Sequence, residues 1–340
     1  MSAVSTKMPE AGTVLETLLR PLAPLLERAD VSDIAVNGPE QLWVEGVRGW
    51  ERIPFPVSND DWLRSVARAV ASSMSSTIGE RSPVLSGHLP TGERIQIVMP
   101  PAASQISLTI RRPSRVLYSL HQLADTGAFA PVLIEGGAGH AVARRELRAD
   151  LANWRPQNPS EIADVLRRLV EQRLNIIVSG ATGSGKTTLS KALIAAIPSD
   201  ERLITIEDAR ELEFHHENSV RLFYSRDGGG TSSVGVQDLL VSCLRMKPSR
   251  ILLAELRDSE AYFYLRNVNS GHPGSITTVH ANSGVGAVEQ LMLMIRQSSA
   301  GAGLSRADIK GLVMSLVDVI IQMERRQVTE IYVLPENMDA

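Results

Sequence analysis

The chain of 340 residues has a formal net charge of −3, and 43% of its residues are hydrophobic. This combination predicts two domains of ordinary size. The slightly negative net charge gives no sign of nucleic-acid binding through overall charge. Direct nucleic-acid binding through a local basic patch stays open. The single cysteine, Cys243, excludes a disulfide framework or a cysteine zinc cluster within the chain and fits a reducing cytoplasm. We expect no secretory signal, because the start lacks a charged segment followed by an apolar one. We expect no membrane-spanning helix, because no apolar run reaches about eighteen residues.

Residues 1–112 are expected to form a first, mixed α/β domain. After a loose tail at 1–10, apolar residues recur at helical spacing through 14–26, where Pro21 and Pro24 predict a bend. A further helix is predicted over 59–75, capped by Asn59 or Asp60. The strands that we expect lie at 33–37, 41–45, 50–53, 93–99 and 105–112. Short strands that follow one another in this way predict a mostly antiparallel sheet.

Residues 113–159 differ in composition from both flanks. They include a glycine cluster at 136–139, an alanine- and arginine-rich stretch at 141–152, and Pro156 and Pro159. We interpret them as a long linker with some helix in it. A linker of this length can seat the first domain on the second domain of its own chain or on that of a neighbouring copy, and the sequence leaves this choice open.

Residues 160–340 are expected to form a second domain in which strands and helices alternate. Ser160 is a candidate cap for its first helix. Strands are predicted at 175–179, 202–207, 219–224, 250–255, 274–279, 317–323 and 328–334. Helices are predicted at 186–197, 235–246, 258–270, 284–297 and 305–315. This order is typical of a RecA-like α/β fold with a mainly parallel sheet.

A glycine-rich loop follows the first of these strands and opens the next helix. Its residues fit the phosphate-binding pattern G-x-x-x-x-G-K-[ST] in the strand–loop–helix context that this pattern requires. Backbone N–H groups would surround phosphate oxygens, Lys186 would reach the β- and γ-phosphates, and Thr187 would help to hold Mg²⁺. The expected nucleotide ligands are Gly180, Ala181, Thr182, Gly183, Ser184, Gly185, Lys186, Thr187 and Thr188.

Two glutamates follow apolar strands and could complete the chemistry. Glu255 ends the run at 250–255, and Glu207 ends the run at 203–207. Carboxylates at the carboxyl ends of parallel strands point into the crevice where ligands bind. One of them could support Mg²⁺ through water, for which we favour Glu255, while the other orients or deprotonates the attacking water. The sequence leaves open which of the two is the base.

His280 follows another β-rich run, at 274–279. Its position at a strand end predicts that it stabilises or senses the γ-phosphate, and the alternative is a purely structural histidine. The histidines lack the spacing of a metal site.

These segments together resemble the secretion superfamily of traffic ATPases. The four matching stretches are 180–187, 204–210, 251–258 and 270–281, which correspond to the Walker A, Asp, Walker B and His boxes. In the first domain, 94–101 and 107–114 are similar to the VirB-eleven-type ATPases of type IV secretion systems. The sequence departs from the usual pattern at Ser249 and Ala254, and neither departure removes a catalytic group.

The resemblance implies a cytoplasmic homohexameric ring that uses ATP and Mg²⁺. Such a ring associates peripherally with the bacterial inner membrane and with other secretion components, including further ATPases and inner-membrane channel proteins. The nucleotide would lie between an N-terminal domain, which also serves oligomerisation, and the RecA-like domain. Hydrolysis would involve Lys186, Thr187, Glu207, Glu255 and His280 at the matching positions.

The resemblance also implies that Arg94 and Arg111 of the first domain reach the phosphates. Strand alternation supports this modestly, since Ile95 and Ile110 face the opposite side from the two arginines. The alternative is that both arginines meet solvent on the polar face of the sheet.

We therefore expect a hydrolase that powers type IV secretion, through conjugative DNA transfer or effector translocation, and pilus biogenesis. A type II secretion or pilus-retraction ATPase is the second interpretation, which the absence of a tetracysteine zinc motif disfavours. A nucleotide-gated docking scaffold is the third. The sequence does not distinguish motor from scaffold, nor does it identify the cargo.

Overall fold

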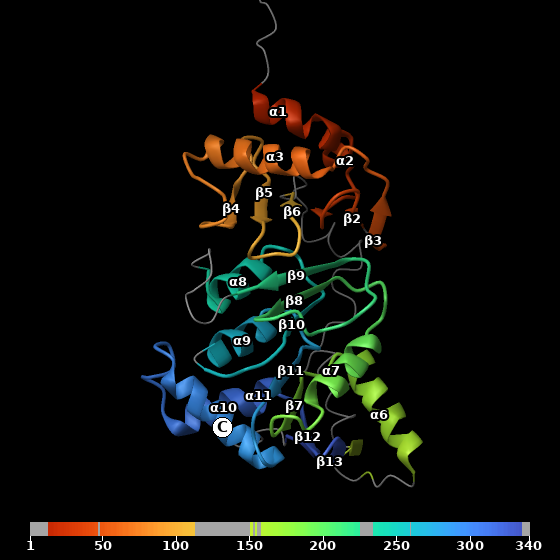
Figure 1. The fold of residues 1–340 in the computed structure, drawn as a ribbon, viewed down its shortest axis with the longest axis vertical. Coiled ribbons are helices and arrows are strands. Elements are labelled where there is room, and N and C mark those ends of the chain that lie inside the picture. The colour runs from red at the N-terminus through yellow and green to blue at the C-terminus, as the bar shows by residue number, and fades with distance from the viewer. Residues whose placement is uncertain are drawn as a thin grey trace, which may run out of the picture.

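The computed structural model describes residues 13–46, 48–112, 150–151, 154, 158–224, 234–258 and 260–334. Two blocks of structure lie one above the other in Figure 1, an N-terminal block of residues 13–112 and a C-terminal block of residues 158–334. The expected linker lies almost wholly outside the described residues. The domain boundaries at 112 and 160 stay a prediction.

The N-terminal block consists of a six-stranded sheet and helices that lie along its top in Figure 1. Every pairing in this sheet is antiparallel, which confirms the predicted sheet type. The strand order is β3-β2-β1-β6-β5-β4. The strands are β1 (Asp33–Val36), β2 (Leu42–Gly46), β3 (Gly49–Ile53), β4 (Val84–His88), β5 (Arg94–Val98) and β6 (Ser107–Arg111).

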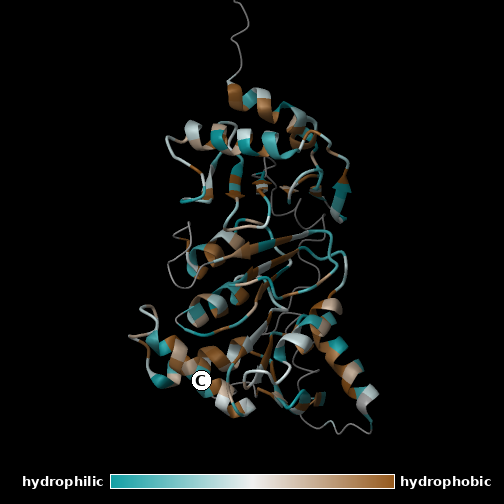
Figure 2. Cartoon of the chain, viewed as in Figure 1, coloured by the Kyte–Doolittle hydropathy of each residue, from teal (hydrophilic) through white to brown (hydrophobic). Residues whose placement is uncertain are grey.

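Capping and proline positions account for the helices of this block. They are α1 (Val14–Leu19), the 3₁₀ turn η1 (Arg20–Leu22), α2 (Ala23–Glu27) and α3 (Asp60–Ser73). The bend expected at Pro21 is the 3₁₀ turn. Asn59 caps α3, because its side-chain oxygen accepts a bond of 2.8 Å from the Trp62 amide. Figure 2 shows α3 in hydrophobic and hydrophilic bands, as expected of a helix with one buried face.

The C-terminal block contains the predicted, mainly parallel strands. One ladder has the order β10-β8-β9 and the other β11-β7-β12-β13, where the last pair is antiparallel. The ladders adjoin where the Leu256 amide donates to the Thr278 carbonyl at 2.8 Å. The strands are β7 (Ile176–Gly180), β8 (Leu203–Glu207), β9 (Ser219–Phe223), β10 (Arg250–Leu253), β11 (Ile276–Val279), β12 (Val319–Glu324) and β13 (Gln327–Val333).

Helices cover this second sheet and bury its apolar strands. They are α6 (Pro159–Glu171), α7 (Lys186–Ala195), α8 (Val236–Cys243), α9 (Glu260–Asn269), α10 (Gly284–Gln297) and α11 (Arg306–Leu316). The first of them begins earlier than the Ser160 cap predicts. Asn158 accepts from the Glu161 amide at 3.1 Å, and Pro159 occupies the first turn, where its missing N–H costs nothing.

The N-terminal block covers the outer edge of the C-terminal sheet. Ala103 forms a bridge with Leu222 of the edge strand β9, and the Phe223 amide donates to the Ala102 carbonyl at 2.8 Å. Both alanines belong to the same buried cluster as the C-terminal core. The backbone of one block therefore continues the hydrogen bonding of the other.

A buried arginine joins the two blocks beside this edge. Arg202 is fully buried and donates to the side-chain oxygens of Asn37 at 2.7 Å and Asn218 at 2.5 Å. Burial lowers the pKa of Arg202 to about 9, so the side chain stays charged at neutral pH. A buried charge is tolerated only where polar partners surround it, so Arg202 depends on Asn37 of the other block.

Replacing Arg202 with methionine should destabilise the contact between the blocks. The change keeps an unbranched apolar stem but removes the guanidinium, which leaves the two asparagine oxygens without their charged donor. We expect a loss of about 2–4 kcal/mol in the free energy of unfolding, measured by urea denaturation. Arg306→Met is the matched control, because Arg306 is exposed and its one ion-pair partner among the described residues is Glu289. Equal stability of the two variants would contradict the structural role of Arg202.

Candidate active site

The phosphate loop leaves β7 through a glycine that no other residue could replace. Gly180 has φ +154, and a Cβ there would lie 2.4 Å from the Met323 carbonyl oxygen and 2.5 Å from the Ser184 hydroxyl. The loop backbone thus lies directly against β12. Gly185, with φ +99, ends the loop and precedes the first residue of α7.

The start of α7 is arranged to bind an anion. Its N-cap residue, Gly185, provides no side-chain hydrogen bond, so the first N–H groups of the helix lack a side-chain partner. These groups and the helix dipole favour a negative charge at this point. A cavity of about 1060 Å³ opens here, and the loop residues that line it are Thr182, Gly183, Gly185, Lys186, Thr187 and Thr188. Of the other expected ligands, Ala181 and Ser184 line a neighbouring cavity of about 460 Å³.

Lys186 lies folded back onto its own loop. Its Nζ donates to the carbonyl oxygens of Gly180 at 2.8 Å and Ala181 at 3.0 Å, and it lies 3.3 Å from His280 Nδ1. Burial lowers the pKa of Lys186, and the Glu255 carboxylate acts in the opposite direction. The ammonium group is therefore at the mouth of the loop, where phosphate oxygens would offer it stronger partners than carbonyl groups do.

His280 connects Lys186 to Glu255. An ammonium group only donates, so His280 Nδ1 accepts and the ring proton is on Nε2, which lies 2.9 Å from Glu255 Oε1. Burial, and then the charge of Lys186, lowers the pKa of His280, which keeps the ring neutral at pH 7. Both side chains line the cavity. The expected proximity of Lys186, His280 and Glu255 is thus present in the structure.

Two backbone contacts hold Glu255 beside His280. Glu255 follows β10, and His280 follows the adjacent β11. The Thr278 hydroxyl donates to the Ala254 carbonyl at 3.0 Å, next to the bond between Leu256 and Thr278. These bonds align the two strand ends, so the carboxylate and the imidazole meet at the same edge of the sheet.

Arg257 is a cavity residue that the sequence analysis missed. Its guanidinium pairs with Glu255, and one of its nitrogens lies 4.0 Å from Asp208 Oδ2. The arginine therefore holds the glutamate from the side opposite His280. Its position two residues after a strand-end acid was the available signal, but an exposed loop arginine has the same appearance in a sequence.

Glu207 does not line the cavity. It is fully buried, and its carboxylate accepts from Thr205 Oγ1 at 2.8 Å and from the amides of Glu211 and Leu212, both at 2.9 Å. Arg221 Nη1 lies 3.5 Å away. In this structure Glu207 therefore organises the turn that brings Glu211 and Leu212 to the cavity wall. Its role in hydrolysis stays a prediction.

Arg94 and Arg111 lie side by side in the N-terminal sheet, away from the phosphate loop. They are cross-strand partners in the pairing of β5 with β6. Arg111 Nε is 3.9 Å from Asp33, and its side chain lines a separate cavity of about 530 Å³ with Lys247 and His272. Neither arginine lines the phosphate-loop cavity of its own chain, so their contact with phosphates stays a prediction.

The residues around the loop fit a nucleotide with Mg²⁺. Magnesium in such sites takes few protein ligands and keeps water and phosphate oxygens in its shell. Thr187 and Glu255 both line the cavity, which provides one hydroxyl and one carboxylate. Among the described residues, no cluster of three or more histidine, cysteine or acidic side chains could hold a metal without the nucleotide.

The fold and the site define a class of protein, a RecA-like protein with a phosphate-binding loop. The family model for type II/IV secretion system proteins matches residues 141–330. The crystal structure of the VirB11 ATPase from the Brucella suis type IV secretion system, in complex with sulphate, superposes with a TM-score of 0.84. The sequence of that VirB11 ATPase is 38% identical to the present chain, and the match covers 94% of each of the two chains.

Curated relatives agree with this class. The type IV secretion system protein VirB11 of Bartonella henselae is 45% identical, over 96% of this chain and 94% of its own length. The type IV secretion system protein PtlH of Bordetella pertussis is 39% identical, over 94% and 92%. The chain belongs to the VirB11 family of type IV secretion system proteins. Within the described residues, no helix has the length and apolar character needed to traverse a bilayer.

The contact between Lys186 and His280 predicts how the pKa of His280 responds to substitution of the lysine. Since the pKa of His280 lies below its ordinary 6.5, acid protonates this histidine in the unfolded chain before it does so in the folded site. The site therefore loses stability as the pH falls below 6.5. In Lys186→Met, NMR titration should give His280 a higher pKa than in the wild type, because one of the two causes of the lowering is gone. Lys191→Met, outside the cavity, should leave the value unchanged, and an unchanged value in Lys186→Met would contradict the contact.

Proposed function

We propose that this protein binds ATP with Mg²⁺ at the phosphate-loop cavity and hydrolyses it to drive type IV secretion. The observation that carries the proposal is the convergence of Lys186, His280 and Glu255 at the uncapped start of α7. A cation and free backbone N–H groups suit phosphates, while a carboxylate beside a neutral histidine suits the activation of water.

Each group has a distinct part in the proposed reaction. The amides of residues 181–186 and the Lys186 ammonium bind the phosphates, and Thr187 holds Mg²⁺, which neutralises charge on the phosphates when bound. Glu255 orients the attacking water and accepts its proton. His280 holds Glu255 in place through Nε2, close to the expected position of the γ-phosphate. Glu207 supports the reaction from the turn that it organises.

The placement of Arg94 and Arg111 supports a ring of copies. Both lie on the N-terminal sheet and outside the cavity of their own chain. Arginines that stabilise phosphoryl transfer are often supplied by a neighbouring protein. We propose a homohexamer in which these two arginines act on the nucleotide of an adjacent copy, so that hydrolysis moves one N-terminal block relative to the next RecA-like domain.

The cellular role follows from the relatives. Their names place them in type IV secretion systems. We propose that this chain serves as a motor for conjugative DNA transfer or effector translocation and for pilus biogenesis. It would act in the cytoplasm, peripherally at the bacterial inner membrane, beside the other ATPases and channel proteins of the system. A docking scaffold that hydrolyses ATP slowly is the alternative that the following test separates.

Glu255→Gln should abolish turnover while nucleotide still binds. The amide keeps the shape of the side chain but cannot accept a proton, so we expect kcat to fall by a factor of about 10²–10³. The dissociation constant for ATP should stay nearly unchanged, since Lys186 and the loop amides are intact. Steady-state ATPase assays and calorimetric titration measure the two quantities. Glu213→Gln is the control, because Glu213 is exposed and outside the cavity.

Two outcomes would weaken this proposal in different ways. Wild-type turnover in Glu255→Gln would remove Glu255 from the reaction. A loss of turnover combined with full secretion in cells would instead favour the scaffold.

Mixing two inactive variants tests whether the arginines act between copies. Arg94→Ala/Arg111→Ala keeps the phosphate loop, and Lys186→Ala keeps the arginines. If the arginines act across a heterologous ring interface, mixed oligomers should regain roughly a quarter of the wild-type activity, because random assembly restores some complete sites. Native mass spectrometry would verify mixing. Mixed oligomers without any recovered ATPase activity would show that the arginines act within a chain or are structural.

A further inference from the structure

The turn between β12 and β13 has an unusual composition for its shape. It consists of Arg325 and Arg326, both with positive φ, at 48° and 68°. Two-residue hairpin turns of this conformation are normally built from asparagine and glycine, because a Cβ is strained there. A pair of arginines in such a turn indicates that the side chains serve a purpose that outweighs the strain.

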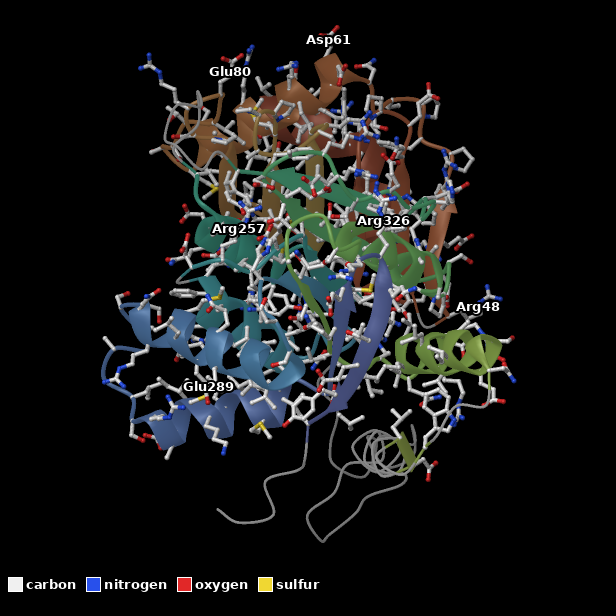
Figure 3. All side chains as sticks on the ribbon, turned by 60° about the horizontal axis from the view of Figure 1, so that its bottom comes forward. Arg48, Asp61, Glu80, Arg257, Glu289 and Arg326 are labelled. Carbon is white, nitrogen blue, oxygen red and sulfur yellow. The ribbon has the colours of Figure 1, made fainter. Side chains whose placement is uncertain are left out.

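This turn is fixed against the phosphate loop by its backbone. The Arg326 amide donates to the Ser184 carbonyl at 2.9 Å. A Cβ on Gly185 would lie 3.3 Å from Arg326 Cα, so the two backbones are in close contact. In Figure 3, Arg326 stands at the tip of the blue hairpin, well apart from Arg257. These backbone contacts therefore fix the position of Arg326 relative to the phosphate loop.

Both residues of the turn are exposed, but they line different cavities. Arg326 lines the cavity of about 1060 Å³. Arg325 is 90% exposed, lies 3.6 Å from Glu324 and lines the neighbouring cavity instead. Among the residues that the structure describes, the Arg326 guanidinium has no hydrogen-bond or ion-pair partner, whereas Lys186 and Arg257 in the same cavity both have partners. Arg326 is thus the cation that a ligand can engage without breaking an existing contact.

The character of the wall around Arg326 indicates which part of a nucleotide it meets. Glu255, His280 and Arg257 belong to the polar part of the cavity, where the proposed hydrolysis of the γ-phosphate would take place. The hairpin contributes Met323 and Val328 to the lining, and the outward face of α7 contributes Leu189 and Ala192. Apolar side chains that share a cavity with a guanidinium suit a flat heteroaromatic ring, because arginine stacks on such rings through its own plane.

We propose that Arg326 binds the nucleoside end of the nucleotide, with its guanidinium stacked on the base over the apolar wall formed by Met323, Val328, Leu189 and Ala192. The inference rests on the proposed ATP binding and adds a residue for affinity and base recognition. The proposal also explains why the turn keeps an arginine at a position of positive φ. Because the backbone of the turn is bonded to the phosphate loop, a side chain at this position lies beside the nucleotide site.

Arg326→Gly is the decisive variant, with Arg325→Gly as its matched control. Glycine keeps the amide that bonds to Ser184 and relieves the positive φ, so both variants should raise the melting temperature by about 1–3 °C. The two ligands compared are ATP, which carries a base, and inorganic tripolyphosphate, which does not, each titrated by calorimetry with Mg²⁺. We expect Arg326→Gly to weaken ATP binding about tenfold and to leave tripolyphosphate binding unchanged. Arg325→Gly should bind both ligands like the wild type.

Three other results would overturn the inference, each in a recognisable way. Equal weakening of ATP and tripolyphosphate in Arg326→Gly would assign the arginine to the phosphates. A lower melting temperature with weakened binding of both would make the side chain a structural support of the loop. A wild type that binds neither ligand would remove the proposed function, and the base site with it.

Discussion

The parallel alignment of β7 with its two neighbours is the constraint on which the site depends. β7 pairs in register with β11 on one side and β12 on the other. Their carboxyl ends therefore meet at one edge, which brings together the phosphate loop, His280 and the hairpin that carries Arg326. Gly180 makes this arrangement possible, because any side chain there would collide with the backbone of β12. The strand register thus determines which loops and side chains meet at the site.

Several polar and charged side chains at this edge contact one another, whereas the Arg326 guanidinium has no partner among the described residues. Lys186 contacts two carbonyl groups and His280, His280 approaches Glu255, and Glu255 pairs with Arg257. In a partly buried site such pairing avoids the cost of an isolated charge. A nucleotide must therefore exchange these internal contacts for its own. Under the proposed function, phosphate binding by Lys186 would affect the position of Glu255, because Lys186 contacts His280 and His280 lies beside Glu255.

The sequence predicted the parts of the site that lie within a single strand–loop segment. The phosphate loop, Glu255 and His280 were recognisable because each follows an apolar strand, and the order of strands and helices predicted the two sheet types that the structure has. The strand at 84–88 was missed, because Ser86, Gly87 and His88 lack a β-rich pattern. Arg326 was missed for a different reason. It lies about 140 residues after the loop that it contacts, and only the pairing of β12 with β7 shows that they are neighbours.

The covered edge of β9 has a consequence for how far the N-terminal block can travel. An edge strand presents unpaired N–H and C=O groups that recruit other strands and promote aggregation. Here the segment around Ala102 and Ala103 occupies those groups. If this segment moved away, it would uncover a hydrogen-bonding template in every copy of the protein at once. Any motion of the N-terminal block must therefore keep this contact closed or replace it with an equivalent one. The seam at β9 thus has a protective role besides its structural one, because it keeps the edge strand of the C-terminal sheet paired.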